Sequence, residues 1–343
     1  MTAKLRSITV LGAGILGLWQ AVTLARAGHR VRLVEAGIDP FANSASMCGG
    51  VMLAPEREAE TAPAMLRVLG HAGVAAWRNL YPDLKTNGSL VVAGARDHGE
   101  LERFAARTQG HRRLDAAEIA AIEPDLAGRF PAALFFAEEA HAPADAAMAF
   151  MLGKAQEAGV EIAFGTASPG ECDVIVDCRG IAARDALPTL RGVRGERALI
   201  RTREVSLRRP VQLLHPRLPL YVVPWDDGVY MIGATVIESE DDGPVTVRSA
   251  LELLGGAYAV HPAFAEAEVI DLAAGVRPAF PDNVPRAIVR DGGRHIFVNG
   301  AYRHGFLLAP VLASAVADYI EGNTPSELLT VECAAFGGKA RMQ

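Results

Sequence analysis

The sequence predicts an α/β protein of two domains, one with a parallel sheet and discontinuous in the chain, the other built on an antiparallel sheet. The chain has 343 residues, which suggests about two domains, and half of them are hydrophobic, enough for sizeable cores. Residues 7–35 read as strand, glycine turn, helix and strand. From about Leu199 short strands and turns dominate, before a last strand and helix typical of the first domain.

The unit over residues 7–35 carries the most specific motif. An apolar run ends at Leu11, and Gly12, Gly14 and Gly17 then fill the pattern G-x-G-x-x-G. Gly12 allows a tight turn, Gly14 lets the backbone approach a pyrophosphate, and Gly17 lets helix and strand pack closely. The helix over 15–27 presents free N–H groups at its N-terminus, and Glu35, after the strand over 31–34, is placed to bind a ribose. This predicts a Rossmann-like dinucleotide site.

A secretory signal peptide is the alternative for this region, because Lys4 and Arg6 precede a long apolar run. It leaves three glycines at motif spacing unexplained, and no clear small-residue cleavage site precedes the second strand.

Charge and composition exclude several other classes. The net charge of −6 and pI of about 5.9 argue against nucleic acid or an anionic membrane as partner. Beyond the N-terminal unit no apolar run nears the roughly 18 residues that span a bilayer. The four cysteines, Cys48, Cys172, Cys178 and Cys333, lack metal-ligand spacing, and few cysteines suit a reducing cytoplasm, so we expect a cytoplasmic protein without a bound metal.

The first half of the chain continues with a small-residue segment, 43–54, which suits close approach to a ligand or, alternatively, forms a flexible loop. We expect a strand over 88–93, with Cys172 and Cys178 flanking another buried strand within 173–180. Helices are expected over 56–81, 97–107, 115–122 and 144–158, and a strand over 160–164.

In the second half, strands over 220–224 and 229–232 join at a turn of Asp226, Asp227 and Gly228. A helix over 247–259, a final strand over 296–298 and a helix over 309–320 follow. The predicted division is 1–80, 140–198 and 276–343 for the dinucleotide domain, and 81–139 and 199–275 for the substrate domain.

Four segments resemble the amino-acid-oxidising flavoenzymes, the family of D-amino acid oxidase, glycine oxidase and sarcosine oxidase. They are GAGILG with Glu35; Met52-Leu53-Ala54-Pro55; Tyr221-Val222-Val223-Pro224 with Gly233-Ala234-Thr235; and Gly275-Val276-Arg277-Pro278 with Asp282, Pro285 and the run from Gly300 to Pro310. The last run is most similar to the glycine oxidases of thiamine biosynthesis.

The resemblance implies an extended FAD, with Gly12, Gly14 and Gly17 at its pyrophosphate and the loop after Gly300 capping the flavin at a helix N-terminus. The expected cofactor-binding residues are Gly12, Gly14, Ile15, Leu16, Gly17, Glu35, Ala36, Ser44, Ser46, Gly50, Met52, Ala167, Gly180, Gly300, Arg303, His304, Gly305, Phe306 and Leu307. Residues 300–303 contain no cysteine that could tether the flavin, so we expect non-covalent FAD; Cys333 is interpreted as incidental.

For the substrate, Arg277 matches the family arginine that holds the carboxylate, since a guanidinium binds a carboxylate in two-pronged fashion. Tyr221 matches a tyrosine that assists it, and Arg303 is a second candidate. A salt bridge between sheet and loop for Arg277, and an ordinary strand aromatic for Tyr221, are the structural alternatives.

The chain also departs from its relatives. Arg57 and Glu58 replace small residues, and Arg57 could either reach the pocket or be a solvated loop charge. Trp225 stands where relatives often have Arg or Lys, Val236 where a methionine can lie, and His304 where glycine oxidases have asparagine.

The resemblance implies oxidation of a small amino acid, glycine first and sarcosine or D-alanine next. A hydride passes from the α-carbon to flavin N5, an imino acid forms, and O2 is reduced to H2O2. A role in thiamine (thiazole) biosynthesis follows, and a homo-oligomer is a further expectation. The alternatives are a flavin dehydrogenase that passes electrons to a quinone or protein, and a non-catalytic nucleotide-binding or redox-sensing module.

Overall fold

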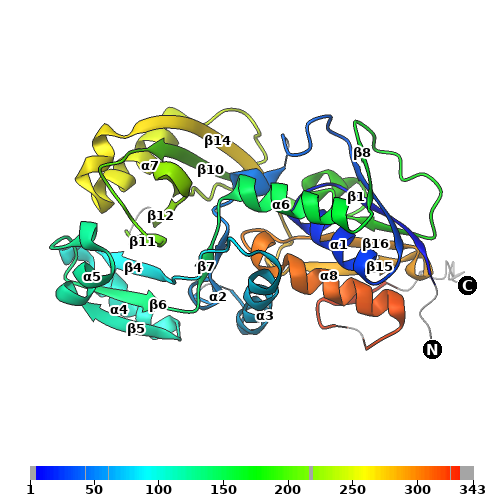
Figure 1. Ribbon diagram of the computed structural model, residues 1–343, viewed down its shortest axis with the longest axis horizontal. Coiled ribbons are helices and arrows are strands. Elements are labelled where there is room, and N and C mark those ends of the chain that lie inside the picture. Colours follow the sequence, from blue (N-terminus) through cyan, green and yellow to red (C-terminus); the bar gives the residue numbers. More distant parts are fainter. Residues whose placement is uncertain (1–4, 43, 61, 216–218, 325, 333–343) are drawn as a thin grey trace, which may run out of the picture.

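A computed structural model describes residues 5–42, 44–60, 62–215, 219–324 and 326–332. Asn43 and Cys333, which the sequence singles out, lie outside these residues. Figure 1 shows two parts side by side, the parallel sheet with its helices and the second sheet with α4, α5 and α7.

The first sheet is almost entirely parallel. Its order is β17 (Leu329–Val331), β15 (Arg286–Arg290), β16 (His295–Asn299), β9 (Val174–Asp177), β1 (Ser7–Leu11), β2 (Arg30–Glu35) and β8 (Glu161–Phe164). Only the β15–β16 pair is antiparallel. The strands from β16 to β8 therefore all end at one edge of the sheet.

Helices cover this sheet and bury its apolar faces. They are α1 (Ile15–Arg26), α3 (Ala64–Leu80), α6 (Ala144–Glu157) and α8 (Gly305–Glu321). Helix α1 packs against α6 and α8, and its residues from Ile15 to Val22 are all buried. A helix that is apolar on nearly all sides is a helix covered on nearly all sides, which explains the long apolar run that resembles a signal peptide.

The second sheet is mostly antiparallel. Its order is β14 (Glu268–Ala279), β10 (Arg191–Arg201), β13 (Val229–Gly233), β12 (Leu220–Pro224), β11 (Val211–Leu214), β4 (Ser89–Ala93), β6 (Ala132–Phe136) and β5 (His111–Asp115). The β11–β4 pair is parallel. The helices α4 (His98–Arg107), α5 (Ala116–Ile122) and α7 (Val247–Val260) accompany it.

A short ribbon of β3 (Met52–Leu53) and β7 (Ala140–His141) lies between the two sheets, next to α2 (Pro55–Glu58). The 3-10 turns are Ala45–Cys48, Ala95–Asp97, Pro124–Leu126, Gly180–Asp185, Asp226–Gly228, Pro262–Glu266 and Asp291–Gly293. The predicted α/β class, with one parallel and one antiparallel sheet, is confirmed.

Several predicted elements need correction. The helix expected over 56–81 is two helices, α2 and α3, because Pro63 has no N–H to continue a helix and restricts the residue before it. The strand over 296–298 is not the last, since β17 follows. The division at 198/199 and 275/276 stays a prediction, although β10 and β14 run through these two boundaries.

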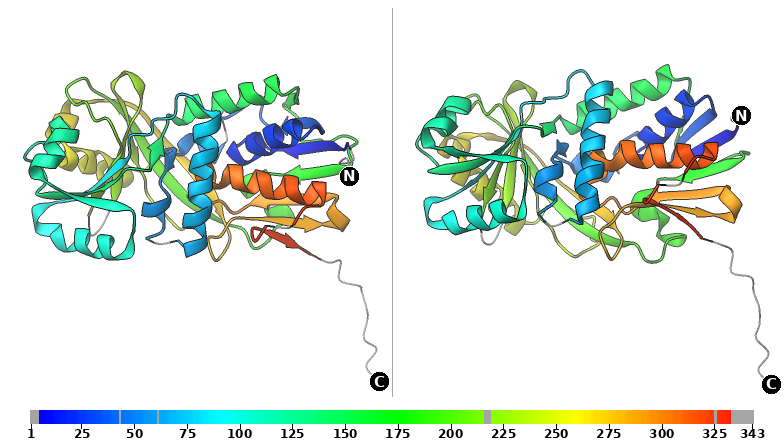
Figure 2. Two further views of the ribbon diagram at one scale, coloured as in Figure 1. Left: turned by 60° about the horizontal axis from the view of Figure 1, so that its bottom comes forward. Right: turned by 90° about the horizontal axis from the view of Figure 1, so that it is seen from below.

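Helix α8 begins at Gly305, one turn before the predicted start, and contains Pro310. A proline leaves the carbonyl four residues earlier without its helical donor. That carbonyl belongs to Phe306, and the Trp77 indole N–H donates to it at 2.7 Å. Figure 2 shows α3 standing across the start of α8, where this bond forms. The bond fixes the beginning of α8 against α3.

Candidate functional site

The glycine turn after β1 is dictated by packing. Gly12 has a φ of +94°, and a Cβ there would lie 2.7 Å from the Cys178 carbonyl oxygen. A Cβ on Gly17 would lie 1.8 Å from the Gly12 carbonyl oxygen. Neither position accepts a side chain, so α1 starts directly against the turn.

The N-terminus of α1 faces hydroxyl groups. Gly14 caps the helix without a side chain, and the Ile15 N–H donates to Ser46 Oγ at 3.2 Å. A Cβ on Gly14 would meet only Ser44 Oγ, at 3.4 Å, and Ser46 Oγ, at 3.6 Å. The positive helix end therefore opens onto a small polar surface, as a pyrophosphate requires.

Glu35 ends β2 beside this turn. Its carboxylate accepts from the Ala13 N–H at 2.8 Å and from the Gly37 N–H at 3.0 Å. These bonds fix the side chain at the carboxyl end of the strand, where the sequence places a ribose acceptor. Ala36 is exposed directly after it.

The other predicted cofactor residues follow the carboxyl ends of neighbouring strands. Ala167 comes after β8, Gly180 after β9 and Gly300 after β16. The Asn299 side chain joins two of these ends, because its Nδ2 donates to the Gly180 carbonyl at 2.9 Å and its Oδ1 accepts from the Gly300 N–H at 2.8 Å. The structure thus brings the predicted residues to one edge of the parallel sheet, the edge at which such sheets bind ligands.

The small-residue segment crosses from this edge to the second sheet. A Cβ on Gly49 would lie 3.3 Å from the Phe306 ring, and one on Gly50 would lie 2.4 Å from Met231 Cε and 3.4 Å from the Tyr221 ring. Met52 follows in β3 and is partly exposed. The segment therefore links the turn after β1 to the strands that carry the predicted substrate residues.

The loop before α8 supplies the remaining predicted residues. His304 precedes the helix and is 5% exposed, and Gly305 opens it. Phe306 and Leu307 are buried, as are Ile15 and Leu16 at the start of α1. These four side chains fix the helix ends in the core, so a ligand at these positions would meet the backbone rather than the side chains.

Arg277 on β14 lies flat on β10. Its Nη1 donates to the Thr235 carbonyl at 3.2 Å, and a Cβ on Gly195 would lie only 2.0 Å from its Nη2. Burial lowers the pKa of Arg277, against smaller opposing effects from Tyr221 and other neighbours. As a whole residue, Arg277 is only partly buried. A guanidinium that is largely desolvated and bonded to a neutral carbonyl is placed to receive an anion.

Tyr221 and Arg303 belong to the same cluster, because both interact electrostatically with Arg277. Arg303 is 33% exposed at its side chain and lies 3.6 Å from Glu58, measured from Nη2 to Oε1. Glu58 Oε2 also lies 3.5 Å from His304 Nδ1. Burial raises the pKa of Glu58, but Arg303, His304, Arg57 and Arg277 lower it by more, so the carboxylate is ionised.

The two interpretations of Arg57 are both wrong. Its side chain is buried, with Nε 2.6 Å from Glu139 Oε2 and Nη1 donating to Gln212 at 3.2 Å. Burial raises the pKa of Glu139 against the effect of Arg57 and Ser89. Arg57 is thus part of a buried ion pair between α2 and the loop before β7, with a further hydrogen bond to β11, and is neither solvated nor free for a substrate.

The other departures lie near the cluster or at the surface. Val236 is 49% exposed, one residue after the Thr235 carbonyl that holds Arg277. Trp225 packs half-buried against the core of the first domain.

Sequence reasoning missed Gly195. A glycine within a strand has no sequence signal that distinguishes a bulge from the close approach of a side chain. Gly195 pairs with Gly275 across β10 and β14, two residues before Arg277, so its role becomes visible only once this register is known.

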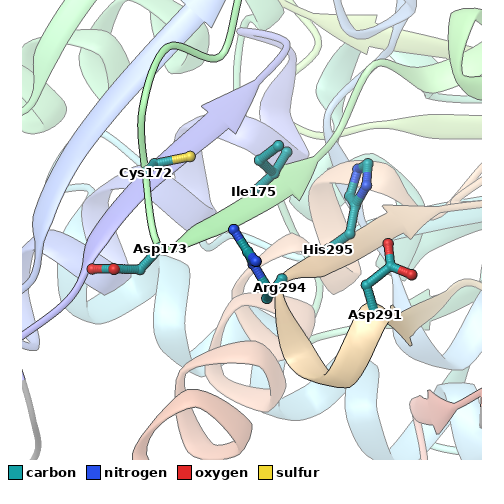
Figure 3. Close-up of a pocket in the computed structure, with 6 residues that line it drawn as sticks. All are labelled: Cys172, Asp173, Ile175, Asp291, Arg294 and His295. Carbon is teal, nitrogen blue, oxygen red and sulfur yellow. The ribbon is translucent and has the colours of Figure 1, made fainter.

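A separate pocket lies at the opposite edge of the parallel sheet. It is lined by Cys172, Asp173, Ile175, Asp291, Arg294 and His295, as Figure 3 shows. These residues lie at the amino ends of β9 and β16, away from the cluster described above. The two cysteines flank β9 as predicted, Cys172 half-buried and Cys178 buried. Within the described ranges, none of the helices is long and apolar enough to cross a membrane.

Comparison with known proteins places the chain among flavoenzymes. Residues 7–319 match the family described as FAD dependent oxidoreductase. A proposed thiamine biosynthesis oxidoreductase, ThiO, of Rhizobium etli is 51% identical over 315 residues, which cover 90% of this chain and 95% of that protein. The glycine oxidase of Pseudomonas aeruginosa is 27% identical over 93% of this chain and 95% of its own length.

Solved structures agree on the fold. The crystal structure of glycine oxidase from Geobacillus kaustophilus superposes with a TM-score of 0.78 at 21% identity, covering 94% of this chain and 96% of that one. The glycine turn and the α1 N-terminus fit the pyrophosphate of such a cofactor without a side chain in the way. The chain therefore belongs to the family of FAD-dependent oxidoreductases, and FAD is its cofactor.

Proposed function

We propose that this enzyme oxidises small amino acids, glycine first and sarcosine or D-alanine next, and that it does so in thiamine biosynthesis. The observation that carries the proposal is the desolvated guanidinium of Arg277, which is hydrogen-bonded only to a backbone carbonyl among the described residues. Similarity to the ThiO of Rhizobium etli supports the pathway, and similarity to glycine oxidases supports the substrate.

FAD would be held without a covalent bond by the residues at the carboxyl edge of the parallel sheet. The glycine turn and the α1 N–H groups would take its pyrophosphate, and Glu35 its ribose. The loop of Gly300–Leu307 would meet the flavin ring. When bound, FAD supplies the redox chemistry, in which the α-carbon loses a hydride and O2 is reduced to H2O2.

The chain's own residues would orient the substrate. Arg277 would bind the carboxylate in two-pronged fashion, and the Tyr221 hydroxyl would donate to the same group. This fixes the α-carbon relative to the cofactor. We assign no general base, since the pKa of Glu58 is lowered, with the Arg303 guanidinium 3.6 Å away, so the carboxylate has little affinity for a proton.

An oxygen-electrode and peroxide assay across glycine, sarcosine, D-alanine, D-proline and bulky D-amino acids tests the proposal. We expect glycine to be turned over with the highest kcat/KM and with one H2O2 formed for each O2 consumed. Turnover of bulky or L-amino acids alone would overturn the substrate. Anaerobic flavin bleaching by glycine without oxygen consumption in air would instead identify a dehydrogenase with a quinone or protein acceptor.

A further inference from the structure

The two arginines of the cluster differ in their partners. Arg303 lies beside the Glu58 carboxylate, whereas Arg277 contacts the Thr235 carbonyl and no carboxylate within hydrogen-bond distance among the described residues. Both guanidinium groups interact electrostatically with Tyr221 and with Tyr302, so both face the same space. The charge of Arg303 is therefore compensated by a carboxylate, whereas the charge of Arg277 is not.

Glu58 is built into the site rather than mobile at its surface. It ends the short helix α2, and its side chain is 16% exposed. The preceding residue, Arg57, is buried and ion-paired to Glu139, which fixes the backbone at this point. The groups that face Glu58 are Arg303 and His304, with Arg57 and Arg277 farther away. The charge of Glu58 is the largest influence on Arg303, whose pKa it raises.

We propose that Glu58 determines specificity by neutralising Arg303, so that Arg277 alone presents an uncompensated guanidinium and the pocket accepts one carboxylate but rejects a second. The inference rests on the proposed function, in which Arg277 binds the substrate carboxylate. A second carboxylate would have to displace Glu58 from Arg303 or lie beside a like charge, and both are unfavourable in a desolvated site.

Glu58→Gln tests this, because it keeps the shape and removes the charge. The substrates are glycine and iminodiacetate, which is glycine with a second carboxymethyl group on nitrogen. Acetate and malonate are unreactive counterparts, and their binding to the holoenzyme is measured from the change in flavin absorbance. We expect the preference for dicarboxylate over monocarboxylate to rise roughly 10- to 100-fold in both pairs, as Arg303 becomes available for a charge-assisted hydrogen bond.

Two further variants separate this effect from a structural one. In Glu58→Gln/Arg303→Met the gain for malonate is lost, because the receptor of the second carboxylate is absent. Glu56→Gln is the matched control on the same helix. Glu56 is more buried than Glu58, with 8% of its side chain exposed against 16%, but it pairs with Arg67 and His71, so removing its charge leaves the acetate-to-malonate ratio unchanged.

An unchanged ratio in Glu58→Gln, with FAD bound, would overturn the proposal, and so would a gain that persists in the double variant. If Glu58→Gln does not hold FAD, the single variant Arg303→Met is the test. It keeps Glu58 and removes the guanidinium that compensates it, so the remaining carboxylate should weaken acetate binding about 10-fold or more. Unchanged acetate binding in Arg303→Met, with FAD bound, would equally overturn the proposal. Because acetate and malonate binding needs no turnover, a wild-type enzyme that ignores glycine would refute the proposed substrate without deciding the role of Glu58.

Discussion

Arg277 shows how much a single side chain depends on its surroundings. It lies on a strand glycine, Gly195, and donates to a backbone carbonyl, so its fork is oriented before any substrate arrives. Arg277→Ala should lower kcat/KM for glycine by about 30-fold to several-thousand-fold, the ~2–5 kcal/mol lost when one partner of a buried charge pair is truncated. Steady-state kinetics with the FAD content measured in parallel check this.

The conservative variants refine that prediction. Arg277→Lys should recover only part of the activity, because an ammonium keeps the charge and loses the fork. Tyr221→Phe should cost about 1–2 kcal/mol, since it removes one hydrogen bond and keeps the ring. Near-normal kcat/KM in Arg277→Ala with FAD bound would refute the carboxylate role and leave Arg303 as the leading candidate.

Gly195→Ala provides an independent test of the Arg277 position. The new Cβ would lie 2.0 Å from Nη2, so the guanidinium must lift from β10. We expect KM for glycine to rise at least about 10-fold, because overpacking that displaces a group costs roughly 1–3 kcal/mol. Gly153→Ala is the matched control, since a Cβ there meets nothing within 4 Å. An unaltered KM in Gly195→Ala would show that Arg277 does not need to lie on β10.

For single residues, the sequence predicts those functional positions at which the residue type and a known motif together indicate ligand binding. Arg277, Tyr221 and the three motif glycines lie in recognisable patterns, and the structure gathers them at the two sheets. Gly195 and the Glu58–Arg303 contact were not predictable. Gly195 and Arg277 are 82 positions apart in the chain, and Glu58 and Arg303 are 245 apart. A local sequence pattern cannot predict which of such distant residues come into contact.

Among the elements, the unit of β1, α1 and β2 is the most constrained. Gly17→Ala should abolish FAD retention, because its Cβ would lie 1.8 Å from the Gly12 carbonyl oxygen and α1 would have to move off the turn. The released flavin, measured by fluorescence after gel filtration, checks this. Gly153→Ala in α6 should retain FAD and gain roughly 0.5–1 kcal/mol of stability from its helix propensity. Equal FAD content in the two variants would contradict the role of the turn.

Local sequence rules predict a helix or strand correctly where its own residues determine its conformation and its ends. The helix predicted over 15–27, observed over Ile15–Arg26, and the strands over 220–224 and 229–232 are of this kind. These rules fail where contacts with residues distant in the sequence determine the element. The helix predicted to start at 309 begins at Gly305, and the Phe306 carbonyl that Pro310 leaves without a donor accepts from Trp77, over 200 residues earlier. β5 and β6 were missed because they are held by pairing with each other and, for β6, with β4.

For the whole molecule, the ribbon of β3 and β7 lies between the two sheets and couples them. His141 in β7 pairs with Met52 of β3, and its backbone also bonds to Lys85 in both directions. Its side chain is 1% exposed and lies among the cations Lys85, Arg57 and Arg209. A buried imidazole in such surroundings is stable only when neutral.

This makes global stability sensitive to acid. Burial first, and then Lys85, Arg57 and Arg209, lower the pKa of His141 from 6.5 to about 4. Between these values the unfolded chain binds a proton that the folded protein does not, so stability is fully present above pH 6.5 and falls as the pH drops towards 4. The loss attributable to His141 is about 3 kcal/mol over this interval.

His141→Gln should remove that loss, because an amide can still donate to the Pro224 carbonyl, which His141 contacts, but does not titrate. Urea unfolding at saturating FAD between pH 4.5 and 7 measures it, and the wild type should lose more stability on acidification than the variant. His98→Gln is the control, since His98 is exposed on α4 and its removal should leave the acid dependence in place. If the wild type and His141→Gln lose stability equally, the acid sensitivity comes from other groups and the neutral, buried state of His141 is wrong.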